Sequence, residues 1–172
     1  MNLNLGSNNI KYKNFLNVDI RNIPEVDIVD DVTKLETIKD DSIDAIIAHN
    51  ILEHISYDKT DACLNNWAKK LKRGGWIEIG VPDGELIFKR YQKGIVTRKE
   101  YNDSSWKDVI HSIFGNMKIV REMHGNDAEK YMHHNIFCES FLRECMEKAG
   151  FKKIIKVKQN HPDNITLRGY KA

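Results

Sequence analysis

Apolar and polar positions alternate along the chain in short runs, which predict strands and helices that follow one another in a regular order. Three apolar runs, at residues 3–5, 15–18 and 26–29, have the length of strands. Residues 43–48 form a longer apolar run, which is typical of a strand buried on both faces of a parallel sheet. The first third of the chain therefore predicts four strands.

Helical spacing follows these runs. Residues 60–72 place apolar side chains on one face of a helix, and Gly74 and Gly75 are expected to stop it. Asp83 has the chemistry of an N-terminal cap for the next helix. The other elements expected are a strand at 76–81, helices at 84–91 and 141–149, and strands at 151–159 and 165–171.

Residues 95–135 interrupt the alternation, with one helical pattern around 106–113 in an otherwise polar, histidine-rich stretch. The flanking pattern predicts a single domain over residues 1–172 with an α/β fold. We expect a doubly wound, mostly parallel sheet that ends in an antiparallel hairpin, with residues 95–135 as an insert before that hairpin. Ligands of such sheets bind at the carboxyl ends of the strands.

Composition narrows the class of protein. The 172 residues suffice for one domain with a sizeable core, and the formal net charge of +2 is spread along the chain, which argues against a nucleic-acid surface. No apolar run approaches the roughly 20 residues of a membrane span, and the N-terminus lacks a secretory pattern. The three cysteines have no CxxC spacing, so we expect reduced thiols in a cytoplasmic protein.

Candidate chemistry begins at Gly6, which follows the first predicted strand, and at Asp19, which ends the second. Glycine lets a ligand approach the backbone closely, and a carboxylate after the second strand can accept hydrogen bonds from ribose hydroxyls. Dinucleotide-binding proteins share these features but need GxGxxG at the start of a helix to hold the pyrophosphate. Residues 6–11 read GSNNIK, so the pattern favours a nucleoside cofactor without phosphate.

Five motifs occur in a characteristic order: "LNLGSN…FLNVDI", "DIVDDV", "DSIDAIIAHNILEHI", "LKRGGWIEIGVPD" and "FLRECMEKAGF". This order resembles the small class I S-adenosylmethionine-dependent methyltransferases, and in particular a compact bacterial group with "NVD" in strand two and "LEH" after strand four. The resemblance spans nearly the whole chain and is weakest in residues 95–135. It implies a Rossmann-like fold and S-adenosyl-L-methionine as cofactor, a nucleoside with a sulfonium and no phosphate.

The resemblance also implies which residues bind the cofactor. They are Gly6, Ser7 and Asn8 at the methionine part, Asp19 with Ile20 beside it at the ribose, Asp31 or its neighbour Asp30 with Val32 at the adenine, and Ala48, His49 and Asn50 at the sulfonium. From the residues alone, the two aspartates at 30 and 31 also fit a solvated turn. Asn8 stands where the family usually has a second glycine. Asparagine tolerates positive φ, so the turn can form, and its side chain would either crowd or hydrogen-bond the amino-acid tail.

Methyl transfer is a direct displacement, so positioning supplies much of the acceleration and a general base matters only for an acceptor that must lose a proton. Seven residues are candidate bases: Glu53, His54, Asp83, His111, His124, His133 and His134. We favour His134 before the last helix, with His54 and Asp83 next. Glu53 and His54 are equally explained as ordinary polar residues in the first turn of a helix, where a glutamate suits the positive end of the helix dipole. Asp83 is equally explained as an N-cap without a catalytic role. No HExxH pairing occurs, so no metal site is predicted. Glu53 stays open, because some related enzymes use acidic residues with a divalent ion.

Residues 95–135 are expected to form a lid over the acceptor, since this fold leaves substrate choice to variable segments. Their aromatics and histidines suit a sugar, a small hydroxylated molecule or an aromatic ring, and the resemblance favours a glycan. We therefore expect methyl transfer to a small-molecule or glycan hydroxyl or amine, with no nucleic-acid partner and a homodimer as one allowed assembly. Two alternatives stay open: a catalytically silent cofactor-binding or partner subunit, and a nicotinamide-dependent oxidoreductase.

Overall fold

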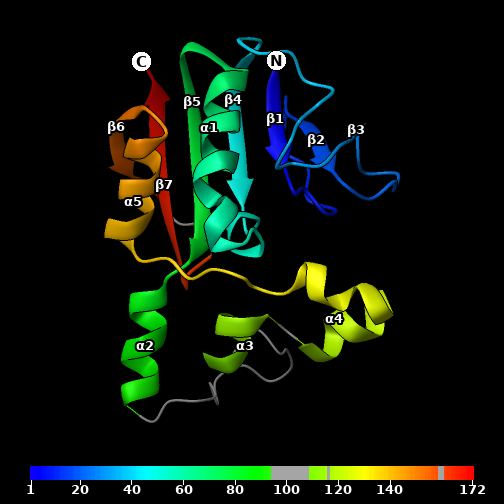
Figure 1. Ribbon diagram of the computed structural model, residues 1–172, viewed down its shortest axis with the longest axis vertical. Coiled ribbons are helices and arrows are strands. Elements are labelled where there is room, and N and C mark those ends of the chain that lie inside the picture. The colour runs from blue at the N-terminus through cyan, green and yellow to red at the C-terminus, as the bar shows by residue number, and fades with distance from the viewer. Residues whose placement is uncertain (94–108, 116, 159–160) are drawn as a thin grey trace.

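The computed structural model describes residues 1–93, 109–115, 117–158 and 161–172. Seven strands form one sheet in the order β3-β2-β1-β4-β5-β7-β6 (Figure 1). Their bounds are β1 Asn2–Leu5, β2 Leu16–Asp19, β3 Ile28–Val29, β4 Ile43–His49, β5 Leu71–Pro82, β6 Phe151–Lys156 and β7 Asn164–Lys171. The first five strands pair in parallel, whereas β7 runs antiparallel to both β5 and β6. The predicted mostly parallel α/β sheet with a terminal antiparallel hairpin is confirmed.

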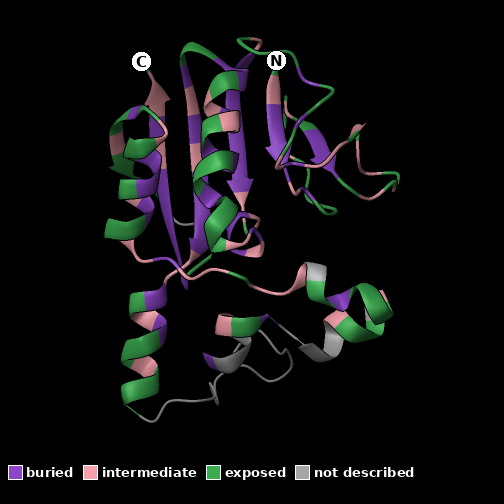
Figure 2. Cartoon of the chain, in the orientation of Figure 1, coloured by how far each residue is buried: buried purple, intermediate pink, exposed green. Residues whose placement is uncertain are grey.

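The core lies between the sheet and two helices. The helices are α1 Thr60–Lys70, α2 Gly84–Gln92, α3 Val109–Phe114, α4 Met117–His124 and α5 Glu139–Lys148, with 3-10 turns η1 Leu52–His54, η2 Tyr57–Lys59 and η4 Gly125–Tyr131. Figure 1 shows α1 and α5 side by side against one face of the sheet. Leu5, Ile46 and Ile77 of neighbouring strands are fully buried there with Trp67 of α1, and the strands are purple along most of their length in Figure 2.

The structure corrects the expected end of α1. The helix ends at Lys70, and β5 begins at Leu71, whose fully buried side chain pairs with Ile43 at the start of β4. Gly74 and Gly75 therefore lie inside β5, where the pairing with β4 shifts register, and do not stop the helix. Burial of the leucine draws the chain into the sheet before the glycines are reached.

The described part of the insert lies beyond the carboxyl ends of the parallel strands, where Figure 1 shows α3 and α4. The predicted helix around 106–113 falls partly outside the described residues, and α3 covers the part that is described. The backbone N–H groups of His134 and Asn135 donate to the carbonyl oxygen of Glu53, at 2.8 and 3.1 Å. These hydrogen bonds tie the end of the insert to the turn that follows β4. In the described parts of the chain, no helix is long and apolar enough to span a membrane.

Candidate active site

A cavity of about 710 Å³ lies where β1, β2 and β4 end, between these strands and the insert. Its volume falls within the range of small-molecule sites. Nine of the residues expected at the cofactor line it: Gly6, Ser7, Asn8, Asp19, Ile20, Asp31, Val32, His49 and Asn50. Ala48 and Asp30 are not part of the lining. The sheet therefore gathers most of the predicted cofactor residues at one place.

Gly6 is required by a contact within the chain. Its φ of +62° lies in the left-handed region, which glycine adopts without strain. A Cβ at this position would lie 2.6 to 2.8 Å from three side-chain atoms of Ile51, which leaves no room for it. Ile51 follows β4 and also lines the cavity. Close packing of these two loops thus shapes the cavity wall.

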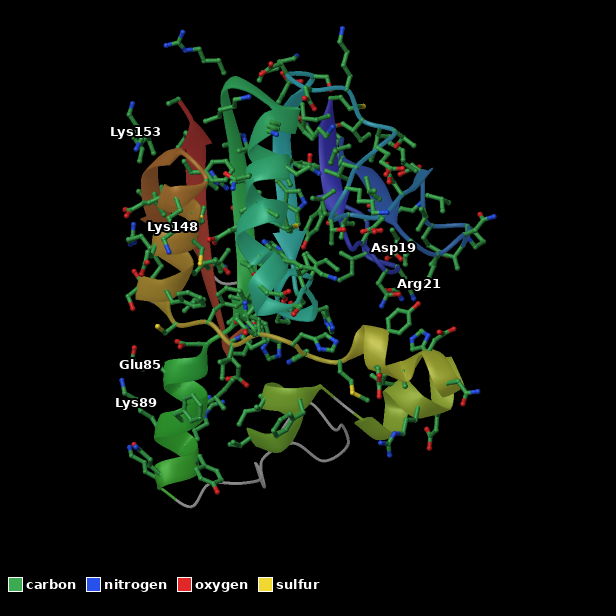
Figure 3. All side chains as sticks on the ribbon, in the orientation of Figure 1. Asp19, Arg21, Glu85, Lys89, Lys148 and Lys153 are labelled. Carbon is green, nitrogen blue, oxygen red and sulfur yellow. The ribbon has the colours of Figure 1, made fainter. Side chains whose placement is uncertain are left out.

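Asp19 ends β2 and is almost fully enclosed by hydrogen-bond donors. Its Oδ1 accepts from the backbone N–H of Arg21 at 3.1 Å and from Nε of Arg21 at 3.0 Å. Its Oδ2 accepts from Nη2 of Arg21 and from the backbone N–H of Asn8, both at 3.0 Å. These four donors fill the four lone-pair positions of the carboxylate. Figure 3 shows Asp19 and Arg21 together beyond the end of β2.

The charge of Arg21 controls the ionisation of Asp19. Burial raises the pKa of Asp19, but the hydrogen bonds from Arg21 and Asn8 and the positive charge of Arg21 outweigh it, so the pKa lies below its ordinary value. Asn8 has a φ of +49°, as its tolerance of positive φ allows, and its Oδ1 accepts from Nη2 of Arg21 at 3.0 Å. Arg21 was not among the predicted site residues, and only its place two residues after the carboxylate points to it.

The loop after β3 separates the roles of the two neighbouring aspartates. Asp31 lines the cavity, and its Oδ1 accepts from the backbone N–H and hydroxyl of Thr33, at 2.9 and 2.7 Å. Asp30 instead accepts from the backbone N–H of Thr37 at 2.9 Å, which fixes the loop away from the cavity. Val32 is buried and lines the cavity. Of the two aspartates, Asp31 has the position expected at an adenine.

The end of β4 is held by a polar network. Nδ1 of His49 lies 3.1 Å from the hydroxyl of Tyr12, and Nε2 lies 3.1 Å from Oε1 of Glu78. Because an ionised carboxylate can only accept, Nε2 donates to Glu78. Arg168 binds the second oxygen of Glu78 at 2.6 Å. The network fixes the ring of His49 at the cavity wall.

The candidate bases separate into one that lines the cavity and two that do not. His54 lines it, with Nδ1 3.0 Å from the carbonyl oxygen of Met132. His134 is exposed and its Nε2 lies 2.8 Å from the carbonyl oxygen of Glu129, outside the cavity lining. Its neighbour His133 lines the cavity, because successive side chains of an extended segment point to opposite sides. His133, one residue before the expected His134, is thus the histidine of this pair that lies at the cavity wall.

Asp83 has a structural role. Its Oδ1 accepts from the backbone N–H groups of Glu85 and Leu86, at 3.0 and 3.3 Å, at the N-terminus of α2. The cap predicted from the sequence is therefore confirmed. Asp83 does not line the cavity, so its expected role as a base has no support from the lining.

Glu53 is the most deeply enclosed acid of the site. The side chain belongs to η1, is 1% exposed and lines the cavity. Oε1 accepts from Nδ2 of Asn50 at 3.1 Å, whereas Oε2 has no hydrogen-bond partner among the described residues. Burial raises the pKa of Glu53.

The insert contributes an aromatic surface to the opposite wall. His124 and Tyr131 both line the cavity, and their rings stack with centroids 3.6 Å apart and an angle of 11° between the planes. This pair presents a flat surface in the same cavity as Asp19. The described part of the insert therefore borders the site, as a lid would.

These residues fit S-adenosylmethionine. The hydroxyl oxygen of Ser7 is buried and has no hydrogen-bond partner among the residues that the structure describes. Ser7 lines the cavity, so a polar group of a ligand can satisfy this hydroxyl. Asp19 supplies a carboxylate in the cavity lining, where the motifs predict a ribose. Residues 6–15, all of which the structure describes, contain no helix and so offer no pyrophosphate cradle. A nucleoside with an amino-acid tail suits this donor and acceptor set.

Comparison with known proteins agrees with this geometry. Residues 6–156 match the model of a methyltransferase domain family, so the chain belongs to that family. The family and the mostly parallel sheet agree with the methyltransferase domain that the motifs predicted. No curated protein sequence matches the chain.

Solved structures show the same fold at low sequence identity. The 1,6-didemethyltoxoflavin-N1-methyltransferase of Burkholderia thailandensis, with bound 1,6-didemethyltoxoflavin and S-adenosylhomocysteine, matches with a TM-score of 0.61 at 14% identity, over 99% of this chain and 70% of that one. A SAM-dependent methyltransferase of Archaeoglobus fulgidus matches with a TM-score of 0.58 at 14% identity, over 99% and 85%. An O-methyltransferase family protein of Burkholderia thailandensis matches with a TM-score of 0.59 at 8% identity, over 99% and 50%. The chain spans 50–61% of the length of several matched structures, so the activity and substrates of the whole protein remain proposals.

Proposed function

We propose that this chain transfers a methyl group from S-adenosylmethionine to a hydroxyl or amine of a small molecule or glycan. The observation that carries the proposal is a single cavity lined both by the loops expected at the cofactor and by the insert expected at the acceptor. A cavity that holds both reactants can align the acceptor atom with the methyl group and the sulfur of the cofactor. This alignment is the main requirement of a methyl displacement.

Bound S-adenosylmethionine supplies a methyl group that its sulfonium already activates. The chain has to hold the cofactor in one orientation. Asp19 binds the ribose hydroxyls after its hydrogen bonds to the guanidinium of Arg21 are exchanged for them. Asp31 and Val32 border the adenine, and the unpaired hydroxyl of Ser7 binds the amino-acid tail.

The acceptor is held by the other half of the lining. The stacked rings of His124 and Tyr131 offer a flat surface on which a sugar or aromatic ring packs. His54 and His133 also line the cavity, and burial lowers the pKa of both imidazoles, which keeps them neutral. A neutral imidazole can accept a hydrogen bond from an acceptor hydroxyl and orient its lone pair toward the methyl group.

One observation favours the alternative of a catalytically silent subunit. Arg21 fills the acceptor positions of Asp19 that the ribose hydroxyls would use. A chain in which this contact persists binds the cofactor weakly and turns nothing over. The nicotinamide alternative has no such support, because the described loop after β1 contains no helix N-terminus for a pyrophosphate.

A labelled-methyl assay tests the proposal. The protein is incubated with methyl-labelled S-adenosylmethionine and panels of sugars, sugar nucleotides and small hydroxylated or amino compounds. We expect transfer of label to a hydroxyl or amine acceptor, and a rate at least about tenfold lower for Asp19→Ala, since one lost charge-assisted hydrogen-bond set weakens cofactor binding. Binding of S-adenosylhomocysteine without transfer to any panel member would favour the silent subunit.

A further inference from the structure

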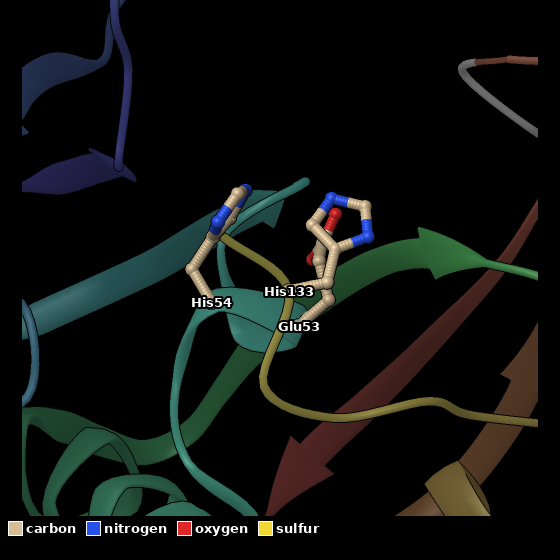
Figure 4. A group of neighbouring side chains, drawn as sticks. All are labelled: Glu53, His54 and His133. Atoms are coloured by element: carbon tan, nitrogen blue, oxygen red, sulfur yellow. The ribbon is translucent and has the colours of Figure 1, made fainter. Parts of the chain in front are cut away.

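Three potential metal ligands converge at the acceptor side of the cavity. Glu53 and His54 belong to η1 after β4, and His133 comes from the segment that leads into α5. One ligand atom from each residue lies within 4.8 Å of the other two. Figure 4 shows the two imidazoles beside the carboxylate of Glu53. The sequence did not predict this cluster, because His133 is about 80 positions away from the other two residues.

The hydrogen bonds of both histidines leave one ring nitrogen of each available to a ligand. Nδ1 of His54 lies 3.0 Å from the carbonyl oxygen of Met132, and Nδ1 of His133 lies 3.0 Å from the carbonyl oxygen of Ser112. A carbonyl oxygen only accepts, so each Nδ1 carries the proton and each Nε2 has the free lone pair. Metal-binding histidines are usually fixed in this way, with the second ring nitrogen donating to a backbone carbonyl.

Glu53 provides an independent sign of a ligand. Its side chain is 1% exposed, and its Oε2 has no hydrogen-bond partner in the part of the chain that the structure describes. A buried carboxylate oxygen without a donor is costly. The two imidazoles lie beside it, and an unprotonated ring nitrogen cannot donate a hydrogen bond to this oxygen. A cation bound between the three groups satisfies all of them at once.

We propose that Glu53, His54 and His133 form a binding site for a divalent transition-metal ion of the zinc type. Two imidazoles and one carboxylate are a ligand set of catalytic zinc sites, which keep further positions open. Ligand atoms of a tetrahedral zinc ion lie about 3.4 Å apart, given metal–ligand distances near 2.1 Å. The three side chains therefore approach one another by about 1 Å when the ion binds. Magnesium is a poor occupant, because it prefers oxygen ligands.

The open position of this site faces the cavity, which all three residues line. An oxygen or nitrogen of the acceptor can bind the ion there, in place of a direct hydrogen bond to the imidazoles. This use of the ion rests on the proposed methyl transfer, whereas binding of the ion does not. Metal binding and cofactor binding can therefore fail separately in an experiment.

Titration of the chelator-treated protein with Zn²⁺, followed by calorimetry without cofactor or acceptor, tests the site. We expect one ion per chain, and binding at least about 100-fold weaker in His133→Ala and in Glu53→Gln, since each change removes a direct ligand. His134→Ala is the matched control, because its imidazole is exposed and lies outside the cavity lining. It should change the affinity less than about twofold.

Two further measurements keep the result unambiguous. Co²⁺ bound by nitrogen and oxygen ligands gives visible bands without thiolate charge-transfer absorption, which separates this site from binding at the half-buried Cys138. Glu53→Gln keeps the side-chain shape, and its thermal unfolding midpoint shows whether the variant is folded. Absence of stoichiometric Zn²⁺ binding in the wild type, or unchanged binding in folded Glu53→Gln and His133→Ala, would overturn the proposal. S-adenosylhomocysteine titrated into the same samples reports separately on the cofactor site.

Discussion

Arg21 holds the carboxylate of Asp19 with two guanidinium nitrogens, Nε 3.0 Å from Oδ1 and Nη2 3.0 Å from Oδ2. Ribose hydroxyls need the same oxygen atoms. The guanidinium must therefore withdraw from the carboxylate before the cofactor binds. Arg21 is a competitor placed beside the binding site, and this competition has two measurable consequences.

The first consequence concerns cofactor affinity. Arg21→Ala frees two acceptor positions on Asp19, so S-adenosylhomocysteine should bind about fivefold more tightly, which corresponds to about 1 kcal/mol. Arg143→Ala is the control, because Arg143 pairs with Glu139 on α5 and does not line the cavity. Calorimetric titration measures both. Weaker binding by Arg21→Ala would mean that the guanidinium contacts the cofactor itself.

The second consequence concerns stability and pH. The pKa of Asp19 is lowered in the folded chain, so its ionised form contributes stability above the unfolded value near 3.9, and this contribution is lost as the pH falls through the lower folded value. Arg21→Ala should reduce the free energy of unfolding by about 1–2 kcal/mol at pH 7. The difference from the wild type should shrink at pH 3. Urea unfolding at both pH values checks this, and an equal difference at the two would contradict it.

The packing of Gly6 against Ile51 predicts a graded loss of stability. Gly74→Ala changes a glycine of similar φ, +78°, with no atom near the added Cβ, so it should cost only the left-handed strain of about 1 kcal/mol. Gly6→Ala adds a clash with Ile51, and we expect about 3 kcal/mol. Ile51→Ala in the Gly6→Ala background removes the clash. The unfolding free energy of this double variant should therefore lie closer to that of Gly74→Ala. Chemical unfolding of the four proteins gives each term, and equal losses for the two glycines would exclude the clash.

Asp83 tests the distinction between a cap and a base. Asp83→Ala removes the acceptor for two N–H groups at the start of α2 and should cost about 1 kcal/mol of stability, whereas Asp83→Asn should retain most of it. Neither change should alter the affinity for S-adenosylhomocysteine. A large loss of methyl transfer in folded Asp83→Asn would show a catalytic role that the cap geometry does not contain.

The sequence predicted the fold class, because short local patterns mark the strands, and most of the residues it proposed for the cofactor line one cavity. Short apolar runs mark the strands, and Gly6 and Asp19 are recognised by their places directly after the first and second of them. The end of α1 was missed because burial of Leu71 beside Ile43 is a contact between distant segments. The residues around Gly74 contain no local pattern from which this contact could be predicted.

Long-range contacts also explain what was missed in the site. The choice between His133 and His134 depends on which side of an extended segment faces Glu53, and the sequence gives the pair without its orientation. The cluster joins Glu53 and His54 of the turn after β4 to His133 near the end of the insert. Arg21 was overlooked because its importance follows from side-chain geometry alone.

Calorimetric titration of S-adenosylhomocysteine into the wild type and Asp19→Ala tests the central claim most directly. The account predicts saturable binding by the wild type in the micromolar range, about −8 kcal/mol, and loss of most of that affinity in Asp19→Ala. Folded wild-type protein that shows no heat of binding and no thermal shift would contradict it.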